Sequence, residues 1–143
     1  MPVNLANLKF INQKIKSLNQ NVDLMAVTKN RTKEDVLNLI NNGVKIFGEN
    51  RVQEANEKFS DLFYMENFSL HLIGPLQTNK VKDALKIFNS IQTIDRIKLV
   101  DEIAKFLNKD FVKTNSFFIQ INIGNEEQKS GVQKEDLDFL YQY

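Results

Sequence analysis

The feature of this sequence that most restricts its fold is a regular alternation between two kinds of apolar segment. Short runs rich in β-branched and aromatic residues are typical of buried strands, and longer stretches with apolar residues at helical spacing are typical of amphipathic helices. The predicted strands are Leu24–Thr28, Val44–Phe47, Leu70–Ile73, Ser90–Thr93 and Phe117–Ile123. Strand and helix alternate five times after an opening helix, which predicts a parallel sheet covered by helices.

Apolar stripes at helical spacing place the helices between these strands. The three clearest stripes are Leu5, Leu8, Ile11, Ile15 and Leu18 in the opening helix, Val81, Ala84, Leu85 and Phe88 in a middle helix, and Ile97, Val100, Ile103 and Leu107 in a later one. A further helix carries Val36, Leu39 and Ile40 inward, and shorter ones are expected at Val52–Phe59 and Glu135–Tyr141. Each predicted strand is thus separated from the next by a predicted helix.

Two of these helices carry recognisable end signals. Thr32 followed by Asp35 resembles a capping box, in which the hydroxyl and the carboxylate bind free backbone N–H groups at a helix start. Gly43 is expected to end the same helix, because glycine adopts the left-handed conformation without a steric penalty. Asp95 is a candidate cap for the helix that follows the fourth strand.

Two α/β architectures fit this alternation. One is an open, doubly wound sheet of the flavodoxin type, which is complete at five strands. The other is a partial (β/α)8 barrel, made of about the first five βα units of a fold that typically needs about 250 residues. At 143 residues the chain is expected to form a single domain, residues 1–143, and this length favours the open sheet. Periodicity alone does not decide between the two.

Composition argues against several functional classes. The formal net charge is +1 and the basic residues are interleaved with acidic ones, so a nucleic-acid partner is not expected. The chain has no cysteine and one histidine, which argues against a zinc site and a cysteine nucleophile. Neither a signal peptide nor an apolar run of about 18 residues is present, so we expect a cytoplasmic protein without a membrane partner.

The candidate site comprises the residues that follow each strand, because both architectures bind ligands at the carboxyl ends of the strands. Lys29 directly follows the apolar run Leu24–Val27. Desolvation of its stem against a barrel interior would favour a neutral amine that attacks an aldehyde, although a lysine after a strand is more often a solvated surface charge. Asn50 follows the second strand. Its amide could face a ligand, or it could be the N-cap of a helix over Arg51–Phe59.

Two further candidates lie along the same edge. His71 is inside the third strand, where a hydrogen-bonded structural role is more common than a catalytic one. Lys129 belongs to a polar loop after the fifth strand. Neither a Walker-type phosphate loop nor GxGxxG occurs, and a single histidine within a strand argues against a hydrolase triad. The edge is suited to a small anionic or carbonyl ligand.

Four segments, taken in order, resemble the signatures of a known family. They are Leu24–Lys29, Phe47–Ala55, His71–Lys82 and Gln120–Val132. In order and spacing they resemble the signatures of the pyridoxal phosphate homeostasis proteins, and they cover nearly the whole chain. Pro75 is a departure, because the family more often has another residue type at that position.

The resemblance implies an alanine-racemase-like (β/α)8 barrel with Lys29 as the Schiff-base lysine for pyridoxal 5'-phosphate (PLP). By analogy, Asn50, His71 and the loop through Lys129 line the surroundings of the cofactor. The family is regarded as mainly non-catalytic and is thought to bind PLP, buffer it and deliver it to PLP-dependent apoenzymes. Racemases of this fold add a C-terminal β-domain, for which 143 residues leave no room.

The length of the chain departs from the family pattern. Family members are longer, so the chain is expected to be truncated after about five of the eight strands. In the family, later loops hold the phosphate and supply an arginine that faces the pyridine nitrogen. An unclosed sheet is expected to expose two edges that invite pairing with another chain. The chain is then a truncated gene product, a fragment, or half of a split barrel completed by a second polypeptide.

Three other functions stay open at the level of the sequence. One is a PLP-dependent amino-acid racemase or decarboxylase-like barrel that uses the same lysine. Another is a decayed or repurposed fragment that binds no cofactor alone and acts as an interaction module. The third is a complete flavodoxin-like domain, which would need an anion site after its first strand, for which residues 28–32 are a faint candidate.

Overall fold

The computed structural model describes residues 3–18, 21–65 and 67–143. Its strands are β1 (Met25–Val27), β2 (Ile46–Glu49), β3 (Ser69–Leu72), β4 (Ser90–Ile94) and β5 (Ser116–Ile119). Its α-helices are α1 (Leu5–Ser17), α2 (Lys33–Asn41), α3 (Val52–Phe59), α4 (Val81–Ile87), α5 (Ile97–Ala104) and α6 (Leu137–Gln142). Within the described ranges, no helix is both long and apolar enough to cross a membrane.

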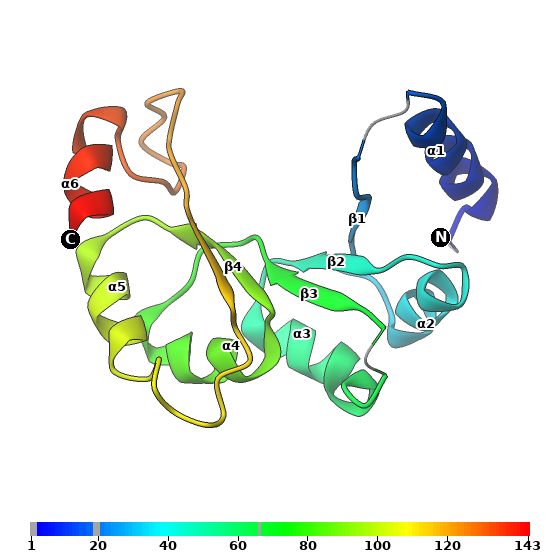
Figure 1. Cartoon of the computed structure of the whole chain (residues 1–143), viewed down its shortest axis with the longest axis horizontal. Coiled ribbons are helices and arrows are strands. Elements are labelled where there is room, and N and C mark those ends of the chain that lie inside the picture. The colour runs from blue at the N-terminus through cyan, green and yellow to red at the C-terminus, as the bar shows by residue number, and fades with distance from the viewer. Residues whose placement is uncertain (1–2, 19–20, 66) are drawn as a thin grey trace.

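All five strands pair in parallel, and their order in the sheet is their order in the chain, β1-β2-β3-β4-β5. A flavodoxin-type sheet has the order 2-1-3-4-5 and carries helices on both faces. Figure 1 shows α2, α3 and α4 on one side of the sheet, whereas the other side is open between α1 and α6. Sequential order with one helix-covered face is the arrangement of a barrel wall, so the chain forms a partial barrel and the flavodoxin alternative is wrong.

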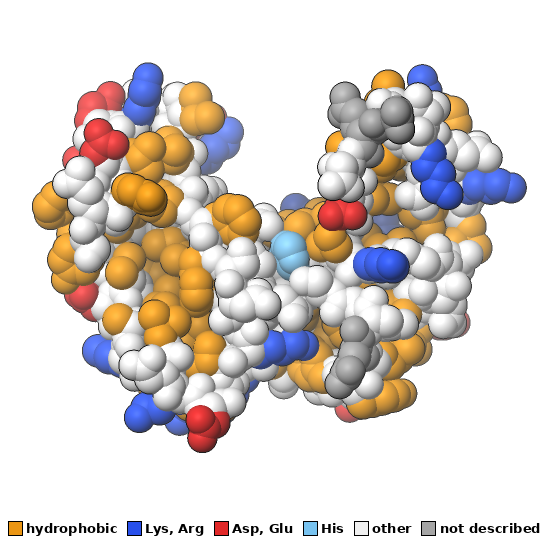
Figure 2. Space-filling model, viewed as in Figure 1, with side chains coloured by type: hydrophobic (Ala, Val, Ile, Leu, Met, Phe, Trp, Pro, Cys, Tyr) orange, Lys and Arg blue, Asp and Glu red, His pale blue; other side chains and the backbone are white. Residues whose placement is uncertain are grey.

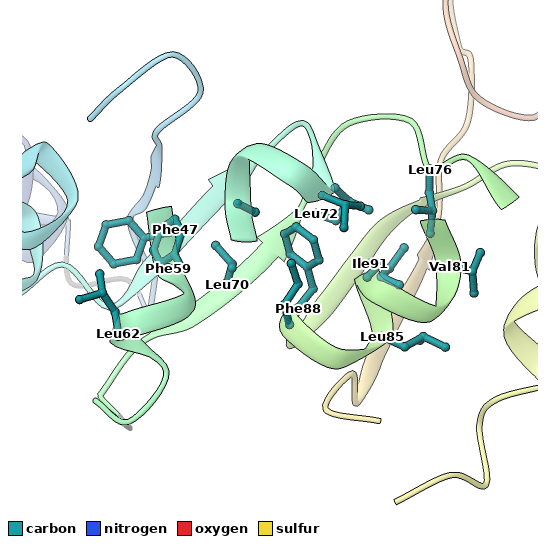
Figure 3. Close-up of a cluster of buried hydrophobic side chains, with 14 of the residues drawn as sticks. Phe47, Phe59, Leu62, Leu70, Leu72, Leu76, Val81, Leu85, Phe88 and Ile91 are labelled. Atoms are coloured by element: carbon teal, nitrogen blue, oxygen red, sulfur yellow. The ribbon is translucent and has the colours of Figure 1, made fainter. Parts of the chain in front are cut away.

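The hydrophobic core lies between the sheet and this helix layer. Figure 3 shows strand residues meeting helix residues there, namely Phe47, Leu70, Leu72 and Ile91 from strands and Phe59, Val81, Leu85 and Phe88 from the helices or their ends, all fully buried. The ring centroids of Phe47, Phe59 and Phe68 are 5.5–5.9 Å apart, a favourable range for aromatic pairs. This aromatic group anchors β2 to α3.

The predicted ends of α2 are confirmed. The Asp35 N–H donates to Thr32 Oγ1 at 3.2 Å, and the Thr32 N–H donates to the Asp35 carboxylate at 3.4 Å, which is the reciprocal pairing of a capping box. Gly43 follows the helix with a φ of +82°, in the left-handed region. The stripe predicted to face inward is buried: Val36, Leu39 and Ile40.

The predicted stripe and cap of α5 are partly wrong. Its buried residues are Leu99 and Ile103, whereas Leu107 lies beyond the helix and is 45% exposed. Arg96 is the N-cap residue and no side chain caps this helix. Asp95, the expected cap, instead forms an ion pair with Arg96. Asp95 therefore lies one residue before the N-cap position, and its carboxylate binds Arg96 and does not cap the helix.

The fifth strand is shorter than predicted. It ends at Ile119, and the chain continues as a loop that returns through an isolated parallel bridge between Ile121 and Val132. Ile123, expected inside the strand, is 88% exposed in this loop. Ile119 pairs with Ile94, the last residue of β4, so the apolar residues after Ile119 have no residue of β4 to pair with.

Apolar side chains are exposed at the two edges of the sheet, as expected for an unclosed parallel sheet. Val27 of β1 is 49% exposed and Phe118 of β5 is 52% exposed. Helix α1 contains the predicted apolar stripe of the opening helix, but none of its residues is buried. In the described part of the chain, β1 and β5 each pair with one neighbouring strand.

Candidate functional site

Three of the predicted site residues lie at one edge of the sheet. Val27 pairs with Gly48 and Gly48 pairs with His71, so these residues form one row across three strands. Lys29 and Asn50 are each two residues further along the chain, about 7 Å nearer the carboxyl edge at the usual rise of a strand. Lys29, Asn50 and His71 therefore come from three neighbouring βα units of the same barrel wall.

Lys29 lies in a tight turn directly after β1. The Arg31 N–H donates to the Thr28 carbonyl at 3.0 Å, and Asn30 has a φ of +58°. Thr28 is buried but Lys29 is exposed, so the predicted desolvation of the lysine stem is wrong. The described strands form only part of a barrel wall, which leaves the turn facing solvent and its amine accessible to a dissolved aldehyde.

Asn50 does not cap α3, so that alternative is wrong. The N-cap residue is Arg51, and no side chain caps the helix. The Asn50 backbone instead packs against Gly74 in the loop after β3, where a Cβ added to Gly74 would lie 2.3 Å from the Asn50 carbonyl oxygen. Asn50 is half-buried and lines a cavity at the carboxyl edge of the sheet.

Replacement of Gly74 by alanine is expected to destabilise the chain by roughly 1–3 kcal/mol, because the new methyl group overlaps backbone atoms that cannot rotate away. Urea denaturation measures the change in the free energy of unfolding. Gly124→Ala is the matched control, because a Cβ at that position first meets the flexible Glu126 side chain, at 3.1 Å. Equal unfolding midpoints for the two variants would contradict the close approach of Gly74 to Asn50.

His71 has the hydrogen-bonded environment expected of a structural histidine. Gln92 Nε2 donates to its Nδ1 at 3.0 Å, and its Nε2 lies 2.9 Å from Ser69 Oγ. An amide nitrogen only donates, so the neutral ring carries its proton on Nε2 and donates it to Ser69. Burial lowers the pKa of His71, which favours this neutral form. Figure 2 shows the imidazole, in pale blue, at the bottom of the hollow on the open face of the sheet.

Lys129 lies apart from the other three residues, in the loop that follows β5. Its ammonium pairs with the Glu126 carboxylate, and its side chain is 61% exposed. Asn122 braces this loop, because its Nδ2 donates to the Glu126 carbonyl at 2.9 Å. Strand β5 is four positions from β1, a distance of roughly 19 Å along the sheet at the usual strand spacing. The structure groups Lys29, Asn50 and His71 but leaves Lys129 on the opposite side of the hollow.

A cavity of about 710 Å³ opens among the loops that follow β2, β3, β4 and β5. Of the four predicted residues, Asn50 lines it. Its charged lining residues are Arg51, Lys80, Arg96 and Asp95, of which the last two are paired with each other. The first turn of α3, with its free N–H groups and positive dipole end, also borders the cavity. The cavity therefore carries an excess of positive charge that suits an anionic group.

A buried ion cluster beneath the Lys29 turn was not predicted from the sequence. Glu49 is fully buried at the end of β2, and Lys58 of α3 is nearly so. Lys58 Nζ lies 2.5 Å from Glu49 Oε1 and 2.9 Å from Glu54 Oε1. Two signals could have indicated it: a carboxylate that ends an apolar strand, and an acid and a lysine four residues apart on the following helix.

The two carboxylates of this cluster are stabilised to different extents. Hydrogen bonding to Lys58, and more weakly to the Asn30 N–H, holds the pKa of Glu54 below its ordinary value in spite of partial burial. Glu49 Oε2 has no hydrogen-bond partner among the described residues. A buried carboxylate that is only half satisfied depends strongly on its remaining partners, here Lys58 and the Thr28 hydroxyl.

The carboxyl edge of the sheet thus offers an exposed primary amine, an amide, a neutral imidazole and a positively charged cavity. A primary amine condenses with an aldehyde. Positive charge raises the local concentration of anions. The combination suits a small molecule that carries both an aldehyde and an anionic group.

Comparison with known proteins identifies curated relatives named pyridoxal phosphate homeostasis protein. The chain is 39% identical over 142 residues to the protein of Haemophilus influenzae, 38% over 133 residues to that of Pasteurella multocida, and 38% over 120 residues to that of Aquifex aeolicus. These alignments cover 92%, 92% and 84% of this chain, but 58%, 56% and 52% of the relatives. The chain therefore spans about half the length of the curated relatives it matches. No protein-family model matches it.

Solved structures have a similar fold. PipY of Synechococcus elongatus without PLP matches with a TM-score of 0.77 at 29% identity, over 91% of this chain and 62% of PipY. PipY with PLP bound gives 0.70 at 25% identity, over 91% of this chain and 63% of PipY. A protein of Bifidobacterium adolescentis gives 0.78 at 27% identity, over 96% of this chain and 60% of its own. The resemblance carried by the four sequence motifs is confirmed.

Proposed function

We propose that this chain, like the curated relatives named pyridoxal phosphate homeostasis protein, binds PLP as a Schiff base on Lys29 and serves PLP homeostasis without catalysing a reaction. The observation that carries the proposal is the place of Lys29. Lys29 is exposed in a turn at the carboxyl end of β1. Asn50, which lines the positively charged cavity, follows the neighbouring strand β2. One solved structure of PipY, a protein of similar fold, has PLP bound.

The groups at this edge fit PLP chemically. PLP carries an aldehyde, a phosphate and a pyridine ring, and when bound it supplies an electrophilic carbon together with an electron-withdrawing ring. Lys29 provides the amine for the aldehyde. Arg51 and Lys80 line the cavity and provide positive charge for an anion. Asn50 lines the same cavity and offers an amide donor and acceptor.

His71 and Lys129 complete the proposed surroundings of the cofactor. Burial lowers the pKa of His71, and contacts with Gln92 and Ser69 fix the orientation of its ring on the floor of the hollow. Lys129 stands on the loop after β5, and in an eight-stranded barrel β5 faces β1 across the axis. Lys129 therefore approaches the cofactor from the side opposite Lys29.

We propose PLP and PLP-dependent apoenzymes as partners, in the cytoplasm, with residues 1–143 acting as one domain. The single continuous sheet supports one domain. The two unpaired edges support a further partner, a second chain that completes the barrel. A non-catalytic role is supported by His71, whose two ring nitrogens are both engaged by neighbouring side chains.

The proposal is tested by trapping. The purified chain is titrated with PLP, reduced with borohydride and digested, and the modified peptide is located by mass spectrometry. We expect saturable modification of the peptide that contains Lys29, and its loss in Lys29→Ala. Lys45→Ala is the control, because Lys45 is also an exposed lysine beside a strand but lies at the amino end of β2.

Two results would contradict parts of the proposal. Equal, unsaturable modification of many lysines would show that the chain does not hold PLP at a site. Racemisation or decarboxylation of added amino acids that depends on Lys29 would show that the chain is an enzyme, which contradicts the homeostatic role but not the site.

A further inference from the structure

The backbone before Lys29 is fixed by the buried ion cluster. The Thr28 hydroxyl donates to Glu49 Oε1 at 2.6 Å, and Lys58 Nζ donates to the Thr28 carbonyl at 2.6 Å. That carbonyl belongs to the planar peptide group whose nitrogen is the Lys29 nitrogen. The plane of the peptide on the N-terminal side of the lysine is therefore set by one residue of β2 and one of α3.

The backbone after Lys29 is fixed by the same cluster. The Asn30 N–H donates to Glu54 Oε1 at 2.6 Å, and this oxygen is also 2.9 Å from Lys58 Nζ. Asn30 has a φ of +58°, in the left-handed region that asparagine adopts more readily than most residues and that a hydrogen bond to its N–H holds in place. Glu54 supplies such a bond from the first turn of α3.

Burial makes these bonds strong. The side chains of Glu49 and Lys58 are 0% and 7% exposed, and that of Glu54 is 25% exposed. Little water reaches the first two, so their charges are weakly screened. The Lys29 residue itself is exposed. The turn is thus held by residues on the helix-covered side of the sheet, while the Lys29 side chain extends into solvent.

We propose that Glu49, Lys58 and Glu54 are positioning residues for Lys29: they fix the peptide groups on both sides of it and so set the direction in which its amine leaves the strand end. The inference rests on the proposed function of Lys29 and deepens it. None of the three needs to touch the cofactor. Catalytic and binding groups work best when their point of attachment is fixed, and a turn bonded on both sides fixes the backbone from which the Lys29 side chain extends.

Glu54 is the residue of choice for the test, because it is partly exposed and its variants keep the buried Glu49–Lys58 pair. We compare Glu54→Ala, which removes the acceptor, with Glu54→Gln, which keeps a carbonyl oxygen for the Asn30 N–H. Glu57→Ala is the matched control, an exposed glutamate on the same helix. Urea denaturation first establishes that each variant is folded.

The first measurement needs no cofactor. Amide hydrogen exchange at Asn30, followed by NMR, is expected to accelerate about tenfold in Glu54→Ala, the effect of losing a hydrogen bond to a charged acceptor. Glu54→Gln is expected to recover part of the protection, and Glu57→Ala to match the parent chain. Unchanged exchange at Asn30 in Glu54→Ala would overturn the proposal.

The second measurement is the initial rate of borohydride-trapped modification of Lys29 by PLP at subsaturating concentration. We expect about a tenfold loss in Glu54→Ala and partial rescue in Glu54→Gln, in step with the Asn30 exchange. If the parent chain is modified but Glu54→Ala reacts as fast as Glu57→Ala, the positioning role is wrong and the proposed function stands. If the parent chain is not modified at all, the proposed function fails, and the exchange at Asn30 alone decides whether the cluster holds the turn.

Discussion

Replacement of Lys58 by methionine is expected to lower the free energy of unfolding by about 3–5 kcal/mol, the cost of leaving a buried charge without its partner. Glu49 is fully buried, and one of its carboxylate oxygens has no hydrogen-bond partner among the described residues. Methionine preserves much of the volume of the lysine stem, so the loss measures charge rather than packing. Urea denaturation, with the slope of the transition held equal, gives the value.

A double substitution separates the charge effect from a general intolerance of the site. Replacing an entire buried ion pair with apolar residues of similar volume is often neutral, so Glu49→Leu combined with Lys58→Met is expected to be more stable than Lys58→Met alone. Lys45→Met serves as the surface control and is expected to change stability by no more than about 0.5 kcal/mol. A double variant less stable than Lys58→Met would contradict an unpaired Glu49 charge as the cause.

Replacement of Phe47 by alanine is expected to destabilise the chain by about 3–5 kcal/mol, because a large buried side chain is lost and the cavity cannot fully collapse. Phe47 is fully buried on β2 and packs edge-on against Phe59 and Phe68, with ring centroids 5.6 and 5.9 Å away. It lies two residues before Glu49. The same change should therefore loosen the strand that carries part of the cluster under Lys29.

Thermal or urea unfolding checks this effect, with Phe10→Ala as the control. Phe10 is an aromatic residue of α1 that is 60% exposed, and its removal is expected to cost no more than about 0.5 kcal/mol. Similar losses for the two phenylalanines would mean that the core does not lie between β2 and α3. A small loss for both would argue that the chain lacks a fixed core.

Elements with strong local signals were predictable from the sequence. The helix over Val52–Phe59 matches its predicted bounds, and the capping box at Thr32 and Asp35 is present. The capping box depends on two residues within one helical turn, and the helix depends on the regular spacing of its apolar residues. Periodicity alone did not separate the barrel from the flavodoxin sheet, because strand order is set by packing between segments far apart in the chain. The resemblance carried by the four motifs did imply the barrel, and that prediction is confirmed.

The site was predictable in its placement but not in its environment. Lys29 was expected after the first strand and is found there, but its exposure depends on how much of the barrel surrounds it. Asn50 lost its alternative role as a cap because the helix begins one residue later than a cap at Asn50 requires. The partners of Glu49 lie on another element, so its role in the buried cluster follows from the fold alone.

The sequential pairing of the strands has a consequence for how this chain gains and loses order. Each strand contacts the one synthesised just before it, so the sheet grows by nearest-neighbour additions that each close a short loop. Opening then begins by fraying at β1 and β5, which each have one neighbour. Lys29 is attached to such a fraying strand. The hydrogen bonds from Glu54 and Lys58 of α3 to the turn around Lys29 oppose the opening of β1. A ligand bound to Lys29 only in the folded state would oppose this opening further, by mass action.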